Sequence, residues 1–272
     1  MTYLTRRILH MAYTKTELLT HLKDLGIDPK GTLLVHSSMK SIGEVEGGAD
    51  TVLDALCEYM KDGLLVLPTH TWSYINAENP RYYVETSEVC VGILPELFRQ
   101  REGVVRSLHP THSVAAIGKD AEEFIKDNEL FDTPCARHSP WGKLLDRKAQ
   151  IMLLGVDLRR NTFIHGVEEW VDIPGRMTDD HQMLITVLPD GTEISVPSRR
   201  HCGDSWSQYF WKVDDMLIKH DAMYKGRFGD AEVRICKTEP MTEILNQMLA
   251  INPHLFSNND PLDEGLYTTV GL

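Results

Sequence analysis

The N-terminal part of the chain alternates helically spaced apolar residues with short, continuously apolar runs. Thr14 and Glu17 have the spacing of a capping box, and leucines that follow at three- and four-residue intervals predict a first helix. An apolar run at residues 32–35 predicts a strand, residues 52–60 return to helical spacing, and residues 64–67 form a second apolar run. This order predicts a strand, helix, strand unit.

The same alternation continues to the middle of the chain and then changes. We expect a helix, a strand, a helix and a strand at residues 94–101, 113–117, 121–127 and 151–156. Such alternation predicts a largely parallel sheet covered by helices. Two apolar segments then flank a Pro-Asp-Gly turn, and the antiparallel hairpin that they predict makes the sheet mixed. The hairpin, a helix, a strand and a closing helix are expected at residues 183–196, 205–219, 232–236 and 241–250.

Size and composition predict one globular domain over residues 1–272, with residues 1–13 as a loosely ordered N-terminal segment. The 40 Asp and Glu residues exceed the 28 Lys and Arg residues, which argues against binding to nucleic acid phosphates. No apolar run approaches the roughly 20 residues needed to span a bilayer. The five cysteines are widely spaced, without a CxxC pair. We therefore expect a soluble, cytoplasmic protein with reduced thiols that binds neither nucleic acid nor membrane.

The segment NTFIHGVE, residues 161–168, concentrates more reactive side chains than any other segment. It follows the predicted strand 151–156, and ligands usually bind beyond the carboxyl ends of strands in open α/β sheets. On a helix, Glu168 or Glu169 could share a face with His165, and a carboxylate on one ring nitrogen makes the other a better base. The alternative is a solvated ion pair on an exposed helix, with Asn161 and Thr162 acting as the N-cap.

Two further polar segments adjoin predicted strands. RSLHPTHS, residues 106–113, offers a guanidinium and two imidazoles, and is either a polar loop or part of a site. VHSSMKSIG, residues 35–43, runs from the first strand into a turn whose free backbone amides could bind phosphates. It lacks the glycine spacing of GxGxxG or GxxxxGK[ST], so it does not indicate a nucleotide site by itself.

Metal binding is an alternative because several histidines and cysteines have ligand-like spacing. His109 and His112 are spaced HxxH, Cys135 and His138 are spaced CxxH, and His201 precedes a cysteine. The chain has no HExxH and no paired CxxC, so a zinc site would need ligands from scattered loops. We expect no metal, and a metal-dependent hydrolase that uses His109, His112, Cys135 and His138 remains the rival interpretation.

Taken together in their order along the chain, six segments resemble the aminoglycoside 3-N-acetyltransferases, the antibiotic N-acetyltransferase family, and among them its YokD-type members. These segments are VHSSMKSIG (35–43), GGADTVLDAL (47–56), LPTHT (67–71), VRSLHPTHSVAAIG (105–118), SPWGKL (139–144) and LLGVDLRRNTFIHGVEE (153–169). The resemblance spans roughly residues 14–250. It implies a three-layer α/β/α fold with a mixed, largely parallel sheet, unrelated to the GNAT acetyltransferases, and an acetyl-coenzyme A-dependent acyltransferase involved in antibiotic resistance.

The resemblance also implies the residues of the site. The family's catalytic histidine matches His165, with Glu168 at the acidic position three residues later. His165 would take a proton from the acceptor amine, Glu168 would orient the ring, and Thr162 or nearby backbone amides would hold the thioester oxygen as charge develops. The segments expected to bind the coenzyme comprise His36, Ser37, Ser38, Met39, Lys40, Ser41, Pro68, Thr69, His70, Arg106, Ser107 and Asn161. His109 is a secondary candidate, either near the coenzyme or near the base.

The acceptor amine is less well defined. Drug-modifying relatives carry a longer insert where this chain has only residues 69–92, so the acceptor could be an aminoglycoside, another amino sugar or an unrelated metabolite. The surplus of carboxylates suits a polycation. A non-catalytic coenzyme A-binding protein of the same fold is a third interpretation, and a homo-oligomer is compatible with the sequence.

Overall fold

The structure, a computed structural model, describes residues 12–268 and 271–272. The predicted first helix is α1 (Lys15–Asp24), and Thr14 and Glu17 form the expected capping box. The predicted strand, helix, strand unit is present as β1 (Thr32–Ser37), α2 (Gly48–Tyr59) and β2 (Leu64–Pro68), with the two strands parallel. Capping chemistry and apolar spacing therefore predicted the N-terminal elements correctly.

Within the described residues, the main sheet has seven strands in the order β4-β5-β2-β1-β6-β10-β9. The strands not yet introduced are β4 (Val105–Arg106), β5 (Val114–Gly118), β6 (Gln150–Leu154), β9 (Met223–Phe228) and β10 (Ala231–Lys237). The central strands β2, β1 and β6 are parallel, whereas β5 and β10 run against their neighbours. The predicted mixed, largely parallel sheet is confirmed.

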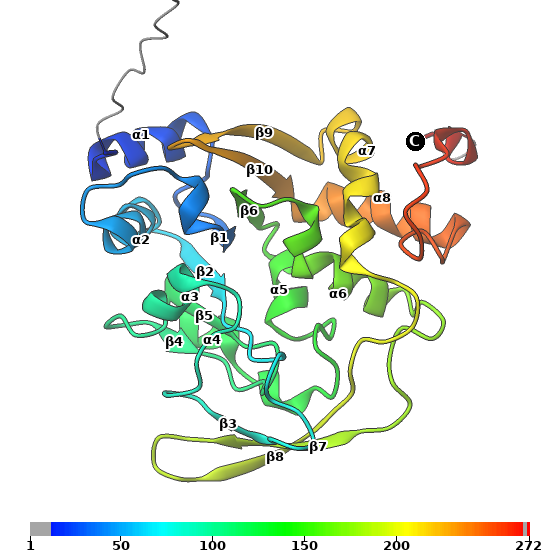
Figure 1. The fold of residues 1–272 in the computed structure, drawn as a ribbon, viewed down its shortest axis with the longest axis horizontal. Coiled ribbons are helices and arrows are strands. Elements are labelled where there is room, and N and C mark those ends of the chain that lie inside the picture. The colour runs from blue at the N-terminus through cyan, green and yellow to red at the C-terminus, as the bar shows by residue number, and fades with distance from the viewer. Residues whose placement is uncertain (1–11, 269–270) are drawn as a thin grey trace, which may run out of the picture.

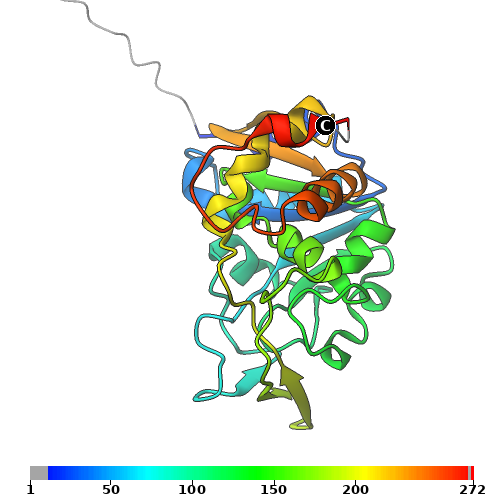
Figure 2. The ribbon, with the colours of Figure 1, turned by 90° about the vertical axis from the view of Figure 1, so that its right-hand side faces the viewer.

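Helices cover both faces of this sheet (Figures 1 and 2). One face packs against α1, α2 and α3 (Ile93–Phe98), and buries Leu33 and Val35 of β1. Leu34 points to the opposite face, as the alternation of a strand requires. The helices of that second layer are α4 (Ala121–Ile125), α5 (Pro140–Asp146), α6 (Thr162–Trp170), α7 (Asp214–Lys219) and α8 (Thr238–Ile251). The chain thus has the expected three layers.

The predicted hairpin exists but lies outside the main sheet. Strands β7 (Gln182–Val187) and β8 (Glu193–Ser198) pair with each other, and β7 also pairs in parallel with β3 (Arg81–Tyr83). This small sheet lies at one end of the molecule (Figure 1) and packs around the buried Tyr82. The expectation that the hairpin makes the main sheet mixed is therefore wrong, because β5 and β10 supply its antiparallel pairings.

Several shorter elements differ from the predictions. The helix expected at residues 205–219 is divided into a 3₁₀ segment (Ser207–Val213) and α7. Two elements were not predicted: β9, whose sequence MYKGRF carries two cations, and α5, although Ser139 caps α5 and Pro140 begins it. Other 3₁₀ turns are Met39–Ser41, Asn128–Leu130, Leu158–Arg160 and Glu264–Leu266.

The predicted loosely ordered segment, residues 1–13, falls mainly on residues 1–11, which lie outside the described residues. Tyr13 is part of the fold: it is buried, pairs with Val45 and donates its hydroxyl to Asp230 Oδ1 at 2.8 Å. In residues 12–268 and 271–272, no helix has both the length and the apolar character needed to cross a membrane.

Candidate active site

A cavity of about 600 Å³ opens where the central parallel strands end. His36 and Ser37 of β1, Pro68 of β2 and Val156 just beyond β6 contribute to its wall. The carboxyl ends of parallel strands lie at the same edge of a sheet, which brings these distant segments together. The volume is in the range typical of small-molecule sites.

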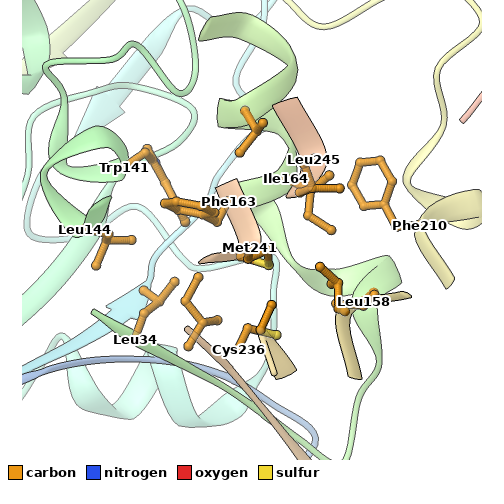
Figure 3. Packing of buried hydrophobic residues seen from close by; sticks show 14 of the residues in the cluster. Leu34, Trp141, Leu144, Leu158, Phe163, Ile164, Phe210, Cys236, Met241 and Leu245 are labelled. Atoms are coloured by element: carbon orange, nitrogen blue, oxygen red, sulfur yellow. The ribbon is translucent and has the colours of Figure 1, made fainter. Parts of the chain in front are cut away.

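Helix α6 forms another part of the wall. Asn161 caps it by accepting a hydrogen bond from the Phe163 amide at 3.3 Å, so the predicted N-cap is confirmed for Asn161, whereas Thr162 is the first residue of the helix. Phe163 and Ile164 are fully buried between the sheet and α8 (Figure 3). This packing fixes the rotation of the helix and leaves Thr162 and His165, one turn apart, on the side of the cavity.

His165 belongs to a buried hydrogen-bond network. Its Nδ1 lies 3.0 Å from Glu168 Oε2, and Arg176 Nε donates to the same oxygen at 3.0 Å. Ser205 donates to the other carboxylate oxygen, and Arg176 Nη2 lies 2.7 Å from the histidine Nδ1. The side chain of Glu168 is 1% exposed and that of His165 is 18% exposed. The alternative of a solvated pair on an exposed helix is therefore wrong.

This network keeps Glu168 ionised. Burial alone would raise the pKa of the Glu168 carboxyl, but the hydrogen bond and charge of His165, the Arg176 guanidinium and the Ser205 hydroxyl lower the pKa below its ordinary value. The two neighbours of Nδ1 have different requirements: the ionised Glu168 carboxylate accepts a proton from Nδ1 and leaves the lone pair on Nε2, whereas Arg176 Nη2 can only donate and needs the lone pair on Nδ1. The geometry is that of an oriented histidine base.

A second carboxylate and imidazole pair lies beside the first. His201 Nε2 is 2.5 Å from Glu169 Oε1, and the Cys135 amide donates to the same oxygen at 2.9 Å. Burial raises the pKa of Glu169 to about 7, against the lowering effect of hydrogen bonds from Thr133 and Cys135. The His201 ring centroid lies 4.7 Å from that of His165. Glu169, the other carboxylate that could have paired with His165, is thus hydrogen-bonded to His201 instead.

Further imidazoles continue along the cavity wall. Ring centroids are 5.7 Å apart between His201 and His112, and 4.7 Å apart between His112 and His70. Burial lowers the pKa of all three well below the ordinary value, so these rings are neutral at neutral pH. His109 lies behind the cavity, where its Nδ1 accepts from the His112 amide at 3.1 Å and burial lowers its pKa to about 4.

The structure brings about half of the predicted site residues to the cavity wall. Those that line it are His36, Ser37, Pro68, His70, Asn161, Thr162 and His165. Those that do not line it are Ser38, Met39, Lys40, Ser41, Thr69, Arg106, Ser107 and Glu168. Arg106 instead braces neighbouring loops, since its buried guanidinium donates to the carbonyls of Thr69 at 2.9 Å and Ser87 at 2.8 Å.

The metal ligands considered for a hydrolase do not assemble. Among the described residues, the one group with three ligand atoms mutually within 4.8 Å is Cys135, Glu169 and His201, which excludes His109, His112 and His138. In that group the Glu169 and His201 atoms already share a hydrogen bond. Burial raises the pKa of the Cys135 thiol well above its ordinary value, which disfavours the thiolate that binds zinc.

Sequence reasoning missed Arg176 and Ser205 and considered His201 only as a metal ligand. All three lie after α6 on irregular segments or isolated bridges, so no periodic pattern marks them. Arg176 is held by its place in the tertiary structure, with Nη1 donating to the Cys202 carbonyl at 3.0 Å. The His-Cys dipeptide at residues 201–202 was the one local sequence feature that pointed to any of the three residues.

Comparison with known proteins identifies the family. The model of the family described as aminoglycoside 3-N-acetyltransferase matches residues 34–250, most of the chain. The chain belongs to that family. As a member of the aminoglycoside 3-N-acetyltransferase family, it is an acyltransferase of this type, as the sequence motifs indicated.

Individual relatives support this assignment over most of the chain. The YokD protein of Bacillus subtilis (strain 168), an SPbeta prophage-derived aminoglycoside N(3')-acetyltransferase-like protein, is 33% identical over 82% of this chain and 87% of its own length. Aminoglycoside N(3)-acetyltransferase IV of Salmonella sp is 30% identical over 90% of each chain. The crystal structure of a histidine-to-alanine mutant of aminoglycoside acetyltransferase AAC(3)-IVa in complex with a gentamicin matches with a TM-score of 0.80 at 28% identity, covering 92% and 93% of the two chains. The expected fold, distinct from GNAT, is confirmed.

Proposed function

We propose that the protein transfers an acetyl group from acetyl-coenzyme A to an amine of an aminoglycoside or related amino sugar, with residues 1–272 acting as one acetyltransferase domain. The observation that carries the proposal is the His165–Glu168 pair, oriented by Arg176 and open to the cavity, in a chain of this family. The relative AAC(3)-IVa, solved with a gentamicin, supports an aminoglycoside-like acceptor.

The cavity has polar groups that suit the coenzyme. The Nε2 atoms of His36 and His70 are buried without a hydrogen-bond partner among the described residues, and both side chains line the cavity. Buried polar atoms are normally satisfied, so these two atoms favour a polar ligand. We assign coenzyme contacts to His36, Ser37, Pro68 and His70, all at the ends of β1 and β2. When bound, acetyl-coenzyme A supplies the acetyl group as an activated thioester.

His165 acts as the general base. Its Nε2 accepts the proton that the amine loses as it attacks the acetyl carbonyl, and the resulting imidazolium is stabilised by Glu168 through Nδ1–H. A positioned base typically contributes about 10²- to 10⁴-fold to the rate. Thr162 lines the cavity one turn before His165, and its hydroxyl has no partner among the described residues, so it is free to donate to the carbonyl oxygen as negative charge develops.

Thiol release tests this function. Purified protein is incubated with acetyl-coenzyme A and a panel of aminoglycosides and simpler amino sugars, and free coenzyme A is measured. We expect His165→Ala to lower kcat by about 10²-fold or more while coenzyme affinity stays close to that of the wild type. The control is His138→Ala, an exposed histidine outside the cavity wall. Undiminished kcat in the His165 variant would exclude the base assignment.

A further inference from the structure

A second imidazole lies beside His165 on the cavity wall. The ring centroids of His165 and His201 are 4.7 Å apart, and both side chains line the cavity. Glu168 and Glu169 are consecutive residues of α6, so their side chains leave the helix in different directions. Glu168 meets His165 and Glu169 meets His201. One helix thus supplies a carboxylate to each of two adjacent rings.

The ring of His201 is held by one nitrogen and open to the cavity at the other. Its Nε2 lies 2.5 Å from Glu169 Oε1, which also accepts from the Cys135 amide at 2.9 Å. The backbone of His201 is fixed by an isolated bridge to Met177. In the described part of the chain nothing is hydrogen-bonded to Nδ1, and protein does not enclose this atom. Nδ1 can therefore meet a ligand.

The charges around this pair compensate one another, apart from that of Glu169 itself. Glu168 is paired with Arg176 at 3.0 Å. Besides His165, the remaining titratable neighbours are uncharged at neutral pH, because burial lowers the pKa of the imidazoles and raises the pKa of the thiol. These neighbours are His70, His109, His112 and Cys135. A proton that reaches the pair therefore neutralises an ionised Glu169.

The two carboxylates of α6 suit different tasks. The pKa of Glu168 is lowered, which keeps it ionised, whereas burial raises the pKa of Glu169 to about 7. A group that titrates near the working pH can both take up and release a proton in each catalytic cycle. Carboxyl groups whose surroundings move their pKa values apart often divide the proton transfers of a reaction between them.

Acetyl transfer to a protonated amine involves two protons. An amine of pKa about 8 is mainly an ammonium ion at pH 7 and has no lone pair. Its first proton must leave before the nitrogen attacks the thioester carbonyl, and the second must leave as the new C–N bond forms. The proposed function gives the second proton to His165 and leaves the first without an acceptor.

We propose that His201 is a second catalytic base, which takes the first proton from the acceptor ammonium. This rests on the proposed acetyltransferase function and deepens it. An N–H bond of the ammonium breaks as Nδ1–H forms, and Nε2 passes its own proton to Glu169, so the imidazole stays neutral. The free amine then attacks, and His165 takes the second proton and gives it to the thiolate that leaves as the C–S bond breaks. Glu169 returns its proton through His201 to water, so each acetyl transfer releases one proton.

The pH dependence of thiol release at saturating acetyl-coenzyme A tests this step. His201→Gln keeps an amide N–H for Glu169 but cannot take up a proton. The variant can use only acceptor that is already deprotonated in solution, about one tenth of an amine of pKa about 8 at pH 7 and about nine tenths at pH 9. Its kcat/KM should therefore be about tenfold below that of the wild type at pH 7 and within about twofold at pH 9. A loss of equal size at both pH values would make His201 a structural brace and overturn the proposal.

A second variant and a control assign the effect to the pair. Glu169→Gln removes the group that receives the proton, so it should show the same pH-dependent loss, and full activity at pH 7 would contradict the relay. The control is His181→Gln, because His181 Nε2 lies 2.8 Å from Asp132 Oδ2 in an exposed imidazole and carboxylate pair that does not line the cavity. Its kcat/KM should equal that of the wild type at both pH values. Calorimetric titration with coenzyme A checks that each variant retains the folded site.

The same measurements separate this proposal from the proposed function. Thiol release by the wild type, together with losses in His201→Gln and Glu169→Gln that shrink as pH rises, would support both. Thiol release by the wild type with pH-independent losses would support acetyl transfer and refute the second base alone. No thiol release by the wild type with any acceptor would refute acetyl transfer and this step with it.

Discussion

Glu168 and Glu169 are adjacent on α6 and both are buried, yet replacing each with glutamine should change stability in opposite directions. Glu168 accepts from His165, Arg176 and Ser205, so its charge is needed in the folded state. Glu168→Gln leaves the guanidinium of Arg176, only 4% exposed, without its counter-ion. Breaking a buried ion pair in this way should cost about 3 kcal/mol of folding free energy.

Glu169 is the reverse case, because its ionised form is disfavoured in the folded state. Its pKa is raised to about 7, so the folded protein binds the proton more tightly than the unfolded chain does. The stability contributed by the protonated carboxyl is complete below the unfolded pKa and is lost as pH rises through about 7. At about pH 8 the folding free energy lost by the wild type reaches about 3 kcal/mol. Glu169→Gln carries no ionisable group at this position, so it should be more stable than the wild type by about that amount. Between about pH 5.5 and pH 8 the difference in stability between variant and wild type should grow by about 2 kcal/mol.

Urea unfolding of the wild type and both variants at about pH 5.5 and pH 8 measures these effects. The pKa of Glu168 is lowered, so its stabilisation is present above the unfolded pKa and the cost of Glu168→Gln should be the same at both pH values. Destabilisation of similar size in both variants, or no pH dependence in the Glu169→Gln difference, would refute this account of the two carboxylates.

Two packing predictions and one capping prediction concern the helices that support the site, and each is measured as the free energy of unfolding in urea. Phe163→Ala removes a fully buried ring between α6 and the sheet and should cost about 3 to 5 kcal/mol; a loss below about 1 kcal/mol would contradict the packing in Figure 3. Gly142→Ala in α5 places a Cβ 1.7 Å from the Arg137 carbonyl oxygen, so we expect a loss of more than about 3 kcal/mol. An unchanged stability would show that the Arg137 carbonyl lies farther from residue 142 than the structure has it. Ser139→Ala removes only the cap of the same helix and should cost about 1 kcal/mol, well below the loss in Gly142→Ala.

Local physics explains why much of the fold was predictable. The capping box at Thr14 and the apolar spacing of α1 and α2 depend on residues within a few positions of one another, so the sequence alone identifies them. The continuous apolar runs of β1, β2 and β6 similarly identify strands buried on both faces. Strand β9 was not predicted because its exposed Lys225 and Arg227 interrupt the apolar run by which the other strands are recognised.

The candidate site was partly predictable for the same reason. The pairing of His165 with Glu168 follows from helical spacing, and family motifs pointed to both residues. Spacing could not choose between Glu168 and Glu169, because both positions can reach the imidazole along a helix. The choice depends on Arg176 and His201, which come from distant segments and select one carboxylate each.

By itself, the sequence determined most of the longer helices and strands, the family and the candidate histidine at the start of α6, because these depend on local spacing and on ordered motifs. Only the tertiary structure decided that the hairpin forms a separate sheet, that Arg106 braces loops outside the cavity wall, and that arginines line the cavity of an acidic chain. The net charge is a sum over all residues of the chain, whereas a bound ligand contacts only the residues that the fold brings to the cavity wall. Their arrangement depends on contacts between segments far apart in sequence, which no local pattern records.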